Sequence, residues 1–240
     1  MKLLAGASGY SFKEWKGTFY PADMKPDGML AYYSARLPTV EINNTFYRMP
    51  NRALLERWAA ETPASFRFAL KSPRQITHMR KLVDVGDAVE KLAEMAGALG
   101  DRLGPILFQL PPFVRKDLGV LEAFLSTFAT VSTQEGKAPG LRAALEFRHA
   151  SWLSDDVYDV LRRHDAALCI ADSEELATPF VATAGWGYLR LRRQDYDEAA
   201  LRGWADRLKA QSYETAYVFF KHEDEGAGPA LARSFRSMMI

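Results

Sequence analysis

The sequence predicts a single (β/α)8 barrel of the TIM type that occupies residues 1–240 as one domain. Three observations lead to this fold class. Short strand-like segments recur eight times, helical patterns alternate with them, and the length of 240 residues is close to the ~250 residues that such barrels commonly need. A doubly wound open sheet uses the same βα units in another strand order and is the main alternative. The count of eight units favours the barrel.

Each predicted strand is a short run rich in β-branched, aromatic and small residues. In chain order the runs are Leu3–Ser8, Thr39–Asn43, Phe66–Lys71, Pro105–Leu110, Arg142–Arg148, Ala166–Asp172, Gly187–Arg192 and Thr215–Lys221.

A helix is expected after each strand, because apolar residues recur there at helical spacing. The helical patterns are Gly28–Leu37, Asn51–Thr62, Gly86–Leu103, Asp117–Phe128, Ser154–His164, Tyr196–Ala210 and Pro229–Met239. Asn51 and Ser154 are suitable N-cap residues for the helices that they open. The first unit is the least regular, since a long aromatic loop at Ser11–Lys25 precedes its helix.

Composition describes a folded chain without a strong overall field. Hydrophobic residues make up 48% and charged residues 25%, as expected of a globular protein. The 31 basic and 30 acidic side chains nearly cancel, which argues against recruitment of nucleic acid or an anionic membrane by net charge. A signal peptide and a membrane-spanning segment are not expected. The lone Cys169 excludes an internal disulfide, so we expect a cytoplasmic protein.

Polar side chains gather where the predicted strands end. Side chains alternate between the two faces of a strand, so apolar residues that pack on helices leave their polar neighbours facing the barrel interior. The C-terminal ends of barrel strands carry the active site in this architecture. The polar groups expected at this face are Glu41, Asn43, Lys71, Gln109, Glu146, Arg148, Asp172, Arg190, Arg192 and Lys221.

Positive groups outnumber negative ones in this set, which predicts a small anionic ligand. Five are cations and three are carboxylates, and the planar fork of arginine favours carboxylate or phosphate. The alternative is that the charges only pair with one another, Lys71 with Glu41 or Glu146 and Arg190 with Asp172, without any chemistry.

The leading hypothesis is a hydrolase or lyase that acts on a phosphate- or carboxylate-bearing compound. In it, Lys71, Arg148 and Arg190 hold the anion, and Glu41 or Glu146 moves a proton. Lys71 is also a candidate Schiff-base nucleophile if Arg67 and Arg148 lower its pKa. The rival is a non-catalytic domain that binds a metabolite or the end of a single-stranded nucleic acid in the same pocket.

Other active-site classes are weaker. A glycosidase pair of Glu41 and Glu146 is disfavoured because neighbouring cations would lower both pKa values. A metal site would use Glu41, Glu146, Asp172 and His222, but no metal-binding motif is present. The sequence contains no motif that identifies a cofactor or an oligomeric interface.

Residues of the loops complete the candidate binding set. His78 lies in the loop after the third strand and is a possible acid or base. Tyr10, Tyr47 and Trp152 could stack on a ligand. For the aromatic residues of the first loop, packing onto the barrel rim is an equally good interpretation.

The chain resembles the YecE-like family, also called domain of unknown function 72, over nearly its full length. The matching stretches are Gly9–Trp15, Phe19–Pro21, Val40–Tyr47, Phe66–Lys71, Ile76–His78, Gly104–Pro112, Leu145–Trp152, Tyr188–Leu191 and Tyr217–Phe220. The resemblance implies a TIM-type barrel and no settled activity. It also implies that the following residues share a site: Glu41, Asn43, Tyr47, Lys71, His78, Gln109, Glu146, Arg148, Trp152 and Arg190.

The chain departs from the family pattern near its C-terminus. Arg192-Arg193 stands where His-Gly is often found, and Lys221-His222 stands where paired asparagines are frequent. Roles in this corner are therefore the least transferable from the family.

Overall fold

The computed structural model describes residues 1–48, 50–134, 140–221 and 226–239. The strands of this part form a closed parallel barrel in which each strand pairs with the next and β8 pairs with β1. The strands are β1 (Lys2–Ala7), β2 (Thr39–Ile42), β3 (Arg67–Lys71), β4 (Leu103–Gln109), β5 (Ala143–Glu146), β6 (Ala167–Asp172), β7 (Trp186–Leu191) and β8 (Thr215–Phe220). The predicted barrel and its eight strands are confirmed.

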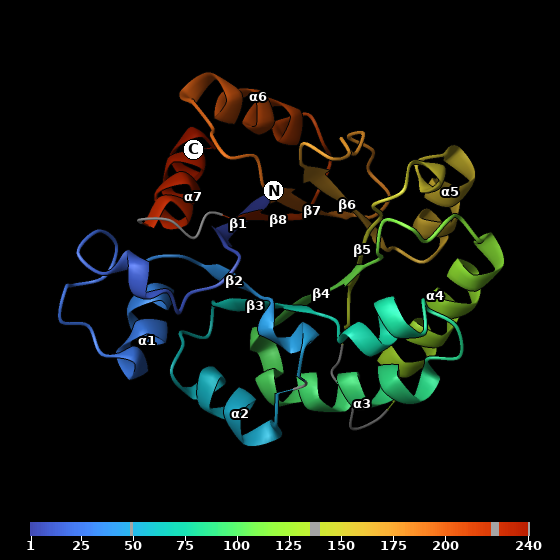
Figure 1. Ribbon diagram of the computed structural model, residues 1–240, viewed down its shortest axis with the longest axis horizontal. Helices are drawn as coiled ribbons and strands as arrows, with labels where there is room; N and C mark the ends of the chain where they lie inside the picture. The colour runs from blue at the N-terminus through green and yellow to red at the C-terminus, as the bar shows by residue number, and fades with distance from the viewer. Residues whose placement is uncertain (49, 135–139, 222–225, 240) are drawn as a thin grey trace.

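Helices surround the strands (Figure 1). They are α1 (Met29–Ser34), α2 (Arg52–Ala60), α3 (Gly86–Ala96), α4 (Leu118–Ser132), α5 (Asp155–Arg163), α6 (Glu198–Lys209) and α7 (Ala227–Met238). Each lies within or near a helical pattern of the sequence. The expectation of a helix after every strand is wrong in the sixth unit, because residues 173–185 cross from β6 to β7 without an α-helix.

One helix ends earlier than expected, and the two predicted N-cap residues differ in their hydrogen bonds. The pattern Gly86–Leu103 is divided, since α3 ends at Ala96 and a 3-10 segment with a left-handed Gly100 leads into β4. At the N-cap of α2, the Asn51 side chain accepts a hydrogen bond from the Leu54 amide at 2.8 Å, as predicted. Ser154 occupies the N-cap of α5 without such a bond.

The two faces of the strands have different cores. The outward side chains pack against the helices in one large apolar cluster. The inward ones form a second, smaller cluster inside the barrel: Leu4, Ala69, Leu107, Ala144, Ala167, Cys169, Trp186, Tyr188, Tyr217 and Phe219. Along each strand, the residues of this cluster precede the inward positions at the C-terminal end. Those last positions are left for polar side chains.

A helix side chain completes the junction between β1 and β2. The ladder joins these strands at a single residue pair, Ala7 with Val40. The buried Tyr33 hydroxyl of α1 accepts a hydrogen bond from the Ala7 amide at 2.8 Å and donates one to the Thr39 carbonyl at 2.9 Å. One hydroxyl therefore bridges the two strands where the backbone ladder is weakest.

We expect Tyr33→Phe to lower the free energy of unfolding by about 1–3 kcal/mol, because the buried Ala7 amide loses its acceptor. Urea unfolding followed by circular dichroism measures this change. Tyr32→Phe is the matched control, since no hydrogen bond of its hydroxyl is found in the described residues, and a change within about 0.5 kcal/mol is expected there. Equal losses in both variants would contradict the bridging role of Tyr33.

Candidate functional site

A cavity of about 480 Å³ opens at the C-terminal end of the strands. Its polar wall contains Ser8, Asn43, Lys71, Gln109, Arg190, Arg192 and Lys221, and its aromatic wall contains Tyr10, Phe12, Phe46, Tyr47 and Trp58. Among the described residues that line it there are four cations and neither Asp nor Glu. The cavity is therefore positive at the surface that a ligand would touch.

Two of the three carboxylates of the predicted site, Glu41 and Glu146, lie below this surface and are bound to Arg190. The Arg190 guanidinium donates to Glu146 Oε2 at 2.5 Å and to Glu41 Oε1 at 2.9 Å. Tyr188 donates to Glu41 Oε2 at 2.7 Å, and the Gln109 amide donates to Glu146 Oε1 at 2.6 Å. All five side chains are buried. The network gives hydrogen bonds to the carboxylate oxygens of Glu41 and Glu146, which would otherwise be buried without a partner.

These contacts keep both glutamates ionised. Burial alone would raise the pKa of Glu146, but the charges of Arg190 and Arg192 outweigh it and lower that pKa to about 2. For Glu41 the same balance of burial against the charge of Arg190 and the Tyr188 hydrogen bond leaves the pKa below its ordinary value. The predicted lowering of both pKa values is confirmed in direction, and it makes either residue a poor proton donor at neutral pH.

Lys71 lies at the end of β3, where its ammonium meets a neutral partner. Its Nζ donates to Gln109 Oε1 at 2.8 Å and lies 4.5 Å from the centre of the Phe46 ring. The other end of the Gln109 amide contacts Glu146. Gln109 therefore separates the ammonium from the carboxylate, and Lys71 has no ion pair among the described residues.

This setting lowers the pKa of Lys71 to about 8. Burial is the largest cause and the charge of Arg190 is the next, while Glu146 and Glu41 oppose them more weakly. From the sequence we expected Arg67 and Arg148 to be the residues that lower this pKa. Arg67 instead binds the carbonyls of Ala64 and Phe66 before β3, at the opposite end of the strand from Lys71.

Loop residues beside Lys71 form the outer rim. Asn43 donates to Glu41 Oε1 at 3.1 Å and lines the cavity. Tyr47 is 75% exposed at the same opening. His78 lies outside the cavity lining, with its ring edge-on to the Phe46 ring at 4.7 Å. Burial together with the charges of Lys71 and Arg148 lowers the pKa of His78.

Arg148 and Trp152 lie outside the cavity lining. Arg148 forms an ion pair with Glu175 in the loop between β6 and β7. Trp152 is buried, stacks on Phe147 at 4.6 Å, and donates from its indole nitrogen to the Val114 carbonyl at 2.9 Å. The interpretation of Trp152 as a ligand platform is therefore wrong, because its ring is enclosed by loop packing.

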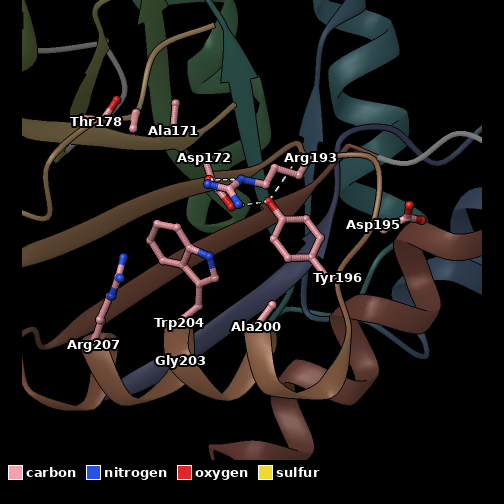
Figure 2. A pocket seen from close by; sticks show the side chains of 11 residues that line it. Ala171, Asp172, Thr178, Arg193, Asp195, Tyr196, Ala200, Gly203, Trp204 and Arg207 are labelled. Carbon is pink, nitrogen blue, oxygen red and sulfur yellow. Dashed lines mark hydrogen bonds and ion pairs between the residues drawn. The ribbon is translucent and has the colours of Figure 1, made fainter. Parts of the chain in front are cut away.

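Asp172 belongs to a different pocket. It follows Leu168 and Ile170 on the outward face of β6, whereas Ala167 and Cys169 face inward. Its carboxylate binds Arg193 Nε and the Tyr196 hydroxyl, each at 2.8 Å, on the outside of the barrel (Figure 2). The prediction that Asp172 shares the cavity is wrong, since it lies one residue out of phase with the inward positions.

The outer pocket has a volume of about 300 Å³ and is lined by α6 and by the loop that replaces the sixth helix. Trp204, Arg207 and Thr178 surround it, with the Asp172–Arg193–Tyr196 contacts at its inner end (Figure 2). It has no lining residue in common with the cavity at the strand ends.

The ion pairs differ from those expected for a purely structural site. Arg190 binds Glu41 and Glu146 in place of Asp172, and Lys71 binds Gln109 in place of a glutamate. The site also contains residues that the sequence analysis did not assign to it, among them Tyr188, Phe46 and Trp58. Tyr188 was detectable, because it precedes Arg190 by two positions and so shares its face. Phe46 was detectable too, because it lies beside Tyr47 in the matching stretch Val40–Tyr47, whereas no sequence signal pointed to Trp58.

The aromatic residues of the first loop divide between two roles. Trp15, Phe19 and Tyr20 are buried and pack against one another beside α1. Tyr10 and Phe12 line the cavity. Packing onto the barrel accordingly explains three of these side chains, and ligand contact stays a prediction for Tyr10.

The described residues contain no group of three or more His, Cys, Asp or Glu side chains placed to hold a metal ion. His222, which the metal hypothesis used, lies outside the described residues. Within the described part of the chain, no helix has the length and apolar character needed to cross a membrane.

Known proteins with similar sequences have no activity in their names. The UPF0759 protein YunF of Bacillus subtilis is 28% identical over 148 residues, which cover 59% of this chain and 50% of that protein. The UPF0759 protein YecE of Escherichia coli is 32% identical over 99 residues, which cover 41% of this chain and 36% of that protein. The matched segments thus span half or less of these relatives.

A solved structure matches over the whole chain. It is a DUF72 family protein of Thermotoga maritima, 25% identical, with a TM-score of 0.84 and coverage of 100% of this chain and 99% of that one. The family model described as "Protein of unknown function DUF72" matches residues 4–240. Its range includes every residue of the cavity lining. The chain therefore belongs to the DUF72 family.

Proposed function

We propose that this protein is an enzyme, a hydrolase or lyase, that acts on a small compound bearing a carboxylate or phosphate. The observation that carries the proposal is the charge of the cavity lining, which has Lys71, Arg190, Arg192 and Lys221 and no carboxylate among its described residues. The volume of about 480 Å³ falls within the range of about 300–1,000 Å³ typical of small-molecule sites. An anion of metabolite size matches both features.

The arginines support anion binding in different ways. Arg190 is fixed by Glu41 and Glu146, so its charge is held in place at the cavity floor. Arg192 is partly exposed, and the contact of its guanidinium with a carboxylate among the described residues is a 3.5 Å approach to Glu146. The buried Nε atoms of both arginines lack a hydrogen-bond partner in the described residues. If the Arg192 side chain turned toward a ligand, an acceptor atom of the ligand would provide the hydrogen bond that Arg192 Nε lacks.

Among the predicted catalytic residues, the geometry favours Lys71 as the group that exchanges a proton. Glu41 and Glu146 are ionised and bound to Arg190, whereas a group with a pKa of about 8 is close to the working pH of most enzymes. A non-catalytic binding domain is the second candidate, and the rigid Arg190 network supports it. Substrate turnover separates the two, because a binder consumes no ligand.

Inorganic phosphate should raise the melting temperature of the protein more than chloride at equal ionic strength, and Arg192→Gln should reduce that effect. Loss of a charged hydrogen bond of about 1.5–3 kcal/mol corresponds to a tenfold or greater loss of affinity. Differential scanning fluorimetry over a phosphate titration measures it. Arg202→Gln is the control, because Arg202 is exposed on α6 and pairs with Glu198.

Small carboxylates are tested in the same assay, to distinguish the two kinds of anion. If phosphate and carboxylates stabilise none of the proteins beyond chloride, or stabilise the Arg192 and Arg202 variants equally, the cavity is not the anion site.

A further inference from the structure

Lys71 differs from an ordinary surface lysine because a neutral side chain holds it inside the cavity. Its nitrogen is fixed by the Gln109 oxygen at 2.8 Å and by the Phe46 ring at 4.5 Å. The Gln109 amide is fixed in turn by Glu146, and Glu146 by Arg190. The lysine nitrogen therefore has a defined position next to the space that a ligand would occupy.

The same arrangement favours the uncharged amine. A carboxylate partner would stabilise the ammonium, but both nearby glutamates are already bound to Arg190. Burial and the charge of Arg190 lower the pKa of Lys71 to about 8, so a substantial fraction of the side chain is a free amine in mildly alkaline solution. A free amine is the form that attacks a carbonyl carbon.

The cavity also contains a means to hold a charged carbonyl compound next to this amine. Arg190 and Arg192 line the same cavity as Lys71 and come from β7 and the residue that follows it, while Lys71 comes from β3. An anionic group bound at the arginines would leave the remainder of a small molecule facing Lys71. Tight positioning of this kind contributes strongly to the rate of an addition reaction.

We propose that Lys71 forms an imine with an aldehyde or ketone that carries a carboxylate or phosphate, which Arg190 and Arg192 hold. This proposal rests on the function proposed above and names its substrate class. It assigns Lys71 a covalent role, with Gln109 as a positioning residue that orients the nitrogen without adding a charge that would stabilise the ammonium.

The step balances without a further reactant. The uncharged Lys71 nitrogen adds to the carbonyl carbon, and the carbon–oxygen π bond becomes an oxygen lone pair that takes up the proton released by the nitrogen. The carbinolamine hydroxyl takes up one proton from solvent, which replaces the proton that the Lys71 ammonium released to become the free amine, and leaves as water. A protonated imine remains, so ammonium and carbonyl have become iminium and water.

Reductive trapping tests the proposal. The full-length protein is incubated with pyruvate, 2-oxoglutarate or glyceraldehyde 3-phosphate in the presence of sodium cyanoborohydride, and peptide mass spectrometry locates the adduct. We expect preferential labelling of Lys71, absent in Lys71→Met and unchanged in Lys209→Met, a lysine exposed on α6. The oxo acids and the phosphate ester distinguish the two kinds of anion. Acetone, which has no anionic group, should label Lys71 more slowly than pyruvate, and the ratio of the two rates should be at least tenfold larger at Lys71 than at the exposed Lys209.

Two further variants separate the roles of the neighbours. Arg192→Gln should slow labelling by pyruvate more than labelling by acetone, because it removes the anion contact as well as a charge that helps to lower the pKa of Lys71. Gln109→Glu should slow labelling by both reagents and move its pH dependence upward, since a carboxylate stabilises the ammonium. Circular dichroism confirms that each variant is folded.

The two proposals fail in different ways. If none of the anionic carbonyl compounds labels Lys71 above the level of exposed lysines, the imine proposal is wrong, even where phosphate still stabilises the protein through Arg192. If labelling occurs on Lys71 with equal rates for pyruvate and acetone, the lysine is reactive but the anion site is not where we place it.

Discussion

Replacing Arg190 with methionine is expected to lower the free energy of unfolding by about 3–5 kcal/mol at pH 7, because it leaves two buried carboxylates without their cation. Glu41 and Glu146 are both within hydrogen-bonding distance of the Arg190 guanidinium. Methionine fills similar space with a flexible apolar chain, so the loss comes mainly from charge. Urea unfolding at pH 7 measures it, and Arg202→Met on the exposed face of α6 should change stability by no more than about 0.5 kcal/mol.

The pH dependence identifies the cause of this loss. In the unmodified protein the pKa of Glu146 is lowered from 4.5 to about 2. Its contribution to stability is therefore complete above pH 4.5 and is lost as the pH falls toward 2. Without Arg190, burial becomes the dominant influence and raises the pKa of both carboxyls, so the variant gains relative stability as the pH falls. The difference between the two proteins should shrink from pH 7 to about pH 5.

Neutralising the carboxylates should restore part of the lost stability. Glu41→Gln and Glu146→Gln, added together to Arg190→Met, remove both uncompensated charges while keeping the side-chain volume. We expect the triple variant to be more stable than Arg190→Met at pH 7 and to show little dependence on pH. If Arg190→Met loses the same stability at both pH values and the glutamines restore nothing, the arginine stabilises the barrel through packing alone.

Strand alternation explains why much of the candidate site could be predicted from the sequence. Period-two patterns assign the inward face without knowledge of the fold, and in a barrel every inward C-terminal residue points toward one axis. This rule brings together side chains from β2, β3, β4, β5 and β7 that are up to 149 residues apart in the sequence. The cavity lining and the network beneath it contain eight of the predicted polar residues: Glu41, Asn43, Lys71, Gln109, Glu146, Arg190, Arg192 and Lys221.

The partners of these side chains could not be predicted in the same way. Strands in a barrel are staggered, so two residues at strand ends can lie at different heights along the axis. Arg190 reaches Glu41 across the barrel, whereas its ladder partner on β6 is Ala171. Asp172, which the sequence paired with Arg190, faces the opposite side of the same strand. A shift of one residue along β6 therefore decides whether a side chain faces the cavity or the outer pocket.

Loop geometry is the other part that the sequence did not determine. Trp152 and Arg148 lie within a stretch shared with the family, but a short 3-10 turn and a contact from the β6–β7 loop turn them away from the cavity. The error about the sixth helix has a similar origin. A helix was expected after each of the eight strands, although no helical pattern had been found between the sixth and seventh strands. Periodicity locates regular elements, and it contains no information on how irregular segments fold over their ends.

Replacing Gly6 with alanine should be as damaging as the loss of Arg190, although Gly6 is neutral and carries no side chain. A Cβ atom at this position would lie 2.0 Å from the Thr39 carbonyl oxygen. The obstacle is backbone of β2, which cannot turn aside as a flexible side chain can. Overpacking a rigid site commonly costs about 1–3 kcal/mol and occasionally more, and we expect the upper end, about 3 kcal/mol, in urea unfolding.

Comparison with Gly203 and Tyr33 shows whether this close approach is the cause. Gly203→Ala in the middle of α6 meets no atom within 4 Å and should gain about 0.5–1 kcal/mol, because alanine favours a helix. The new Cβ of Gly6→Ala would also lie 3.0 Å from the Tyr33 hydroxyl oxygen. If Tyr33→Phe restored the stability of Gly6→Ala, the hydroxyl and not the strand would be the obstacle. We expect no restoration, because the Thr39 carbonyl remains where β1 and β2 meet, and the barrel can accommodate the added atom only by separating these strands beside the cavity.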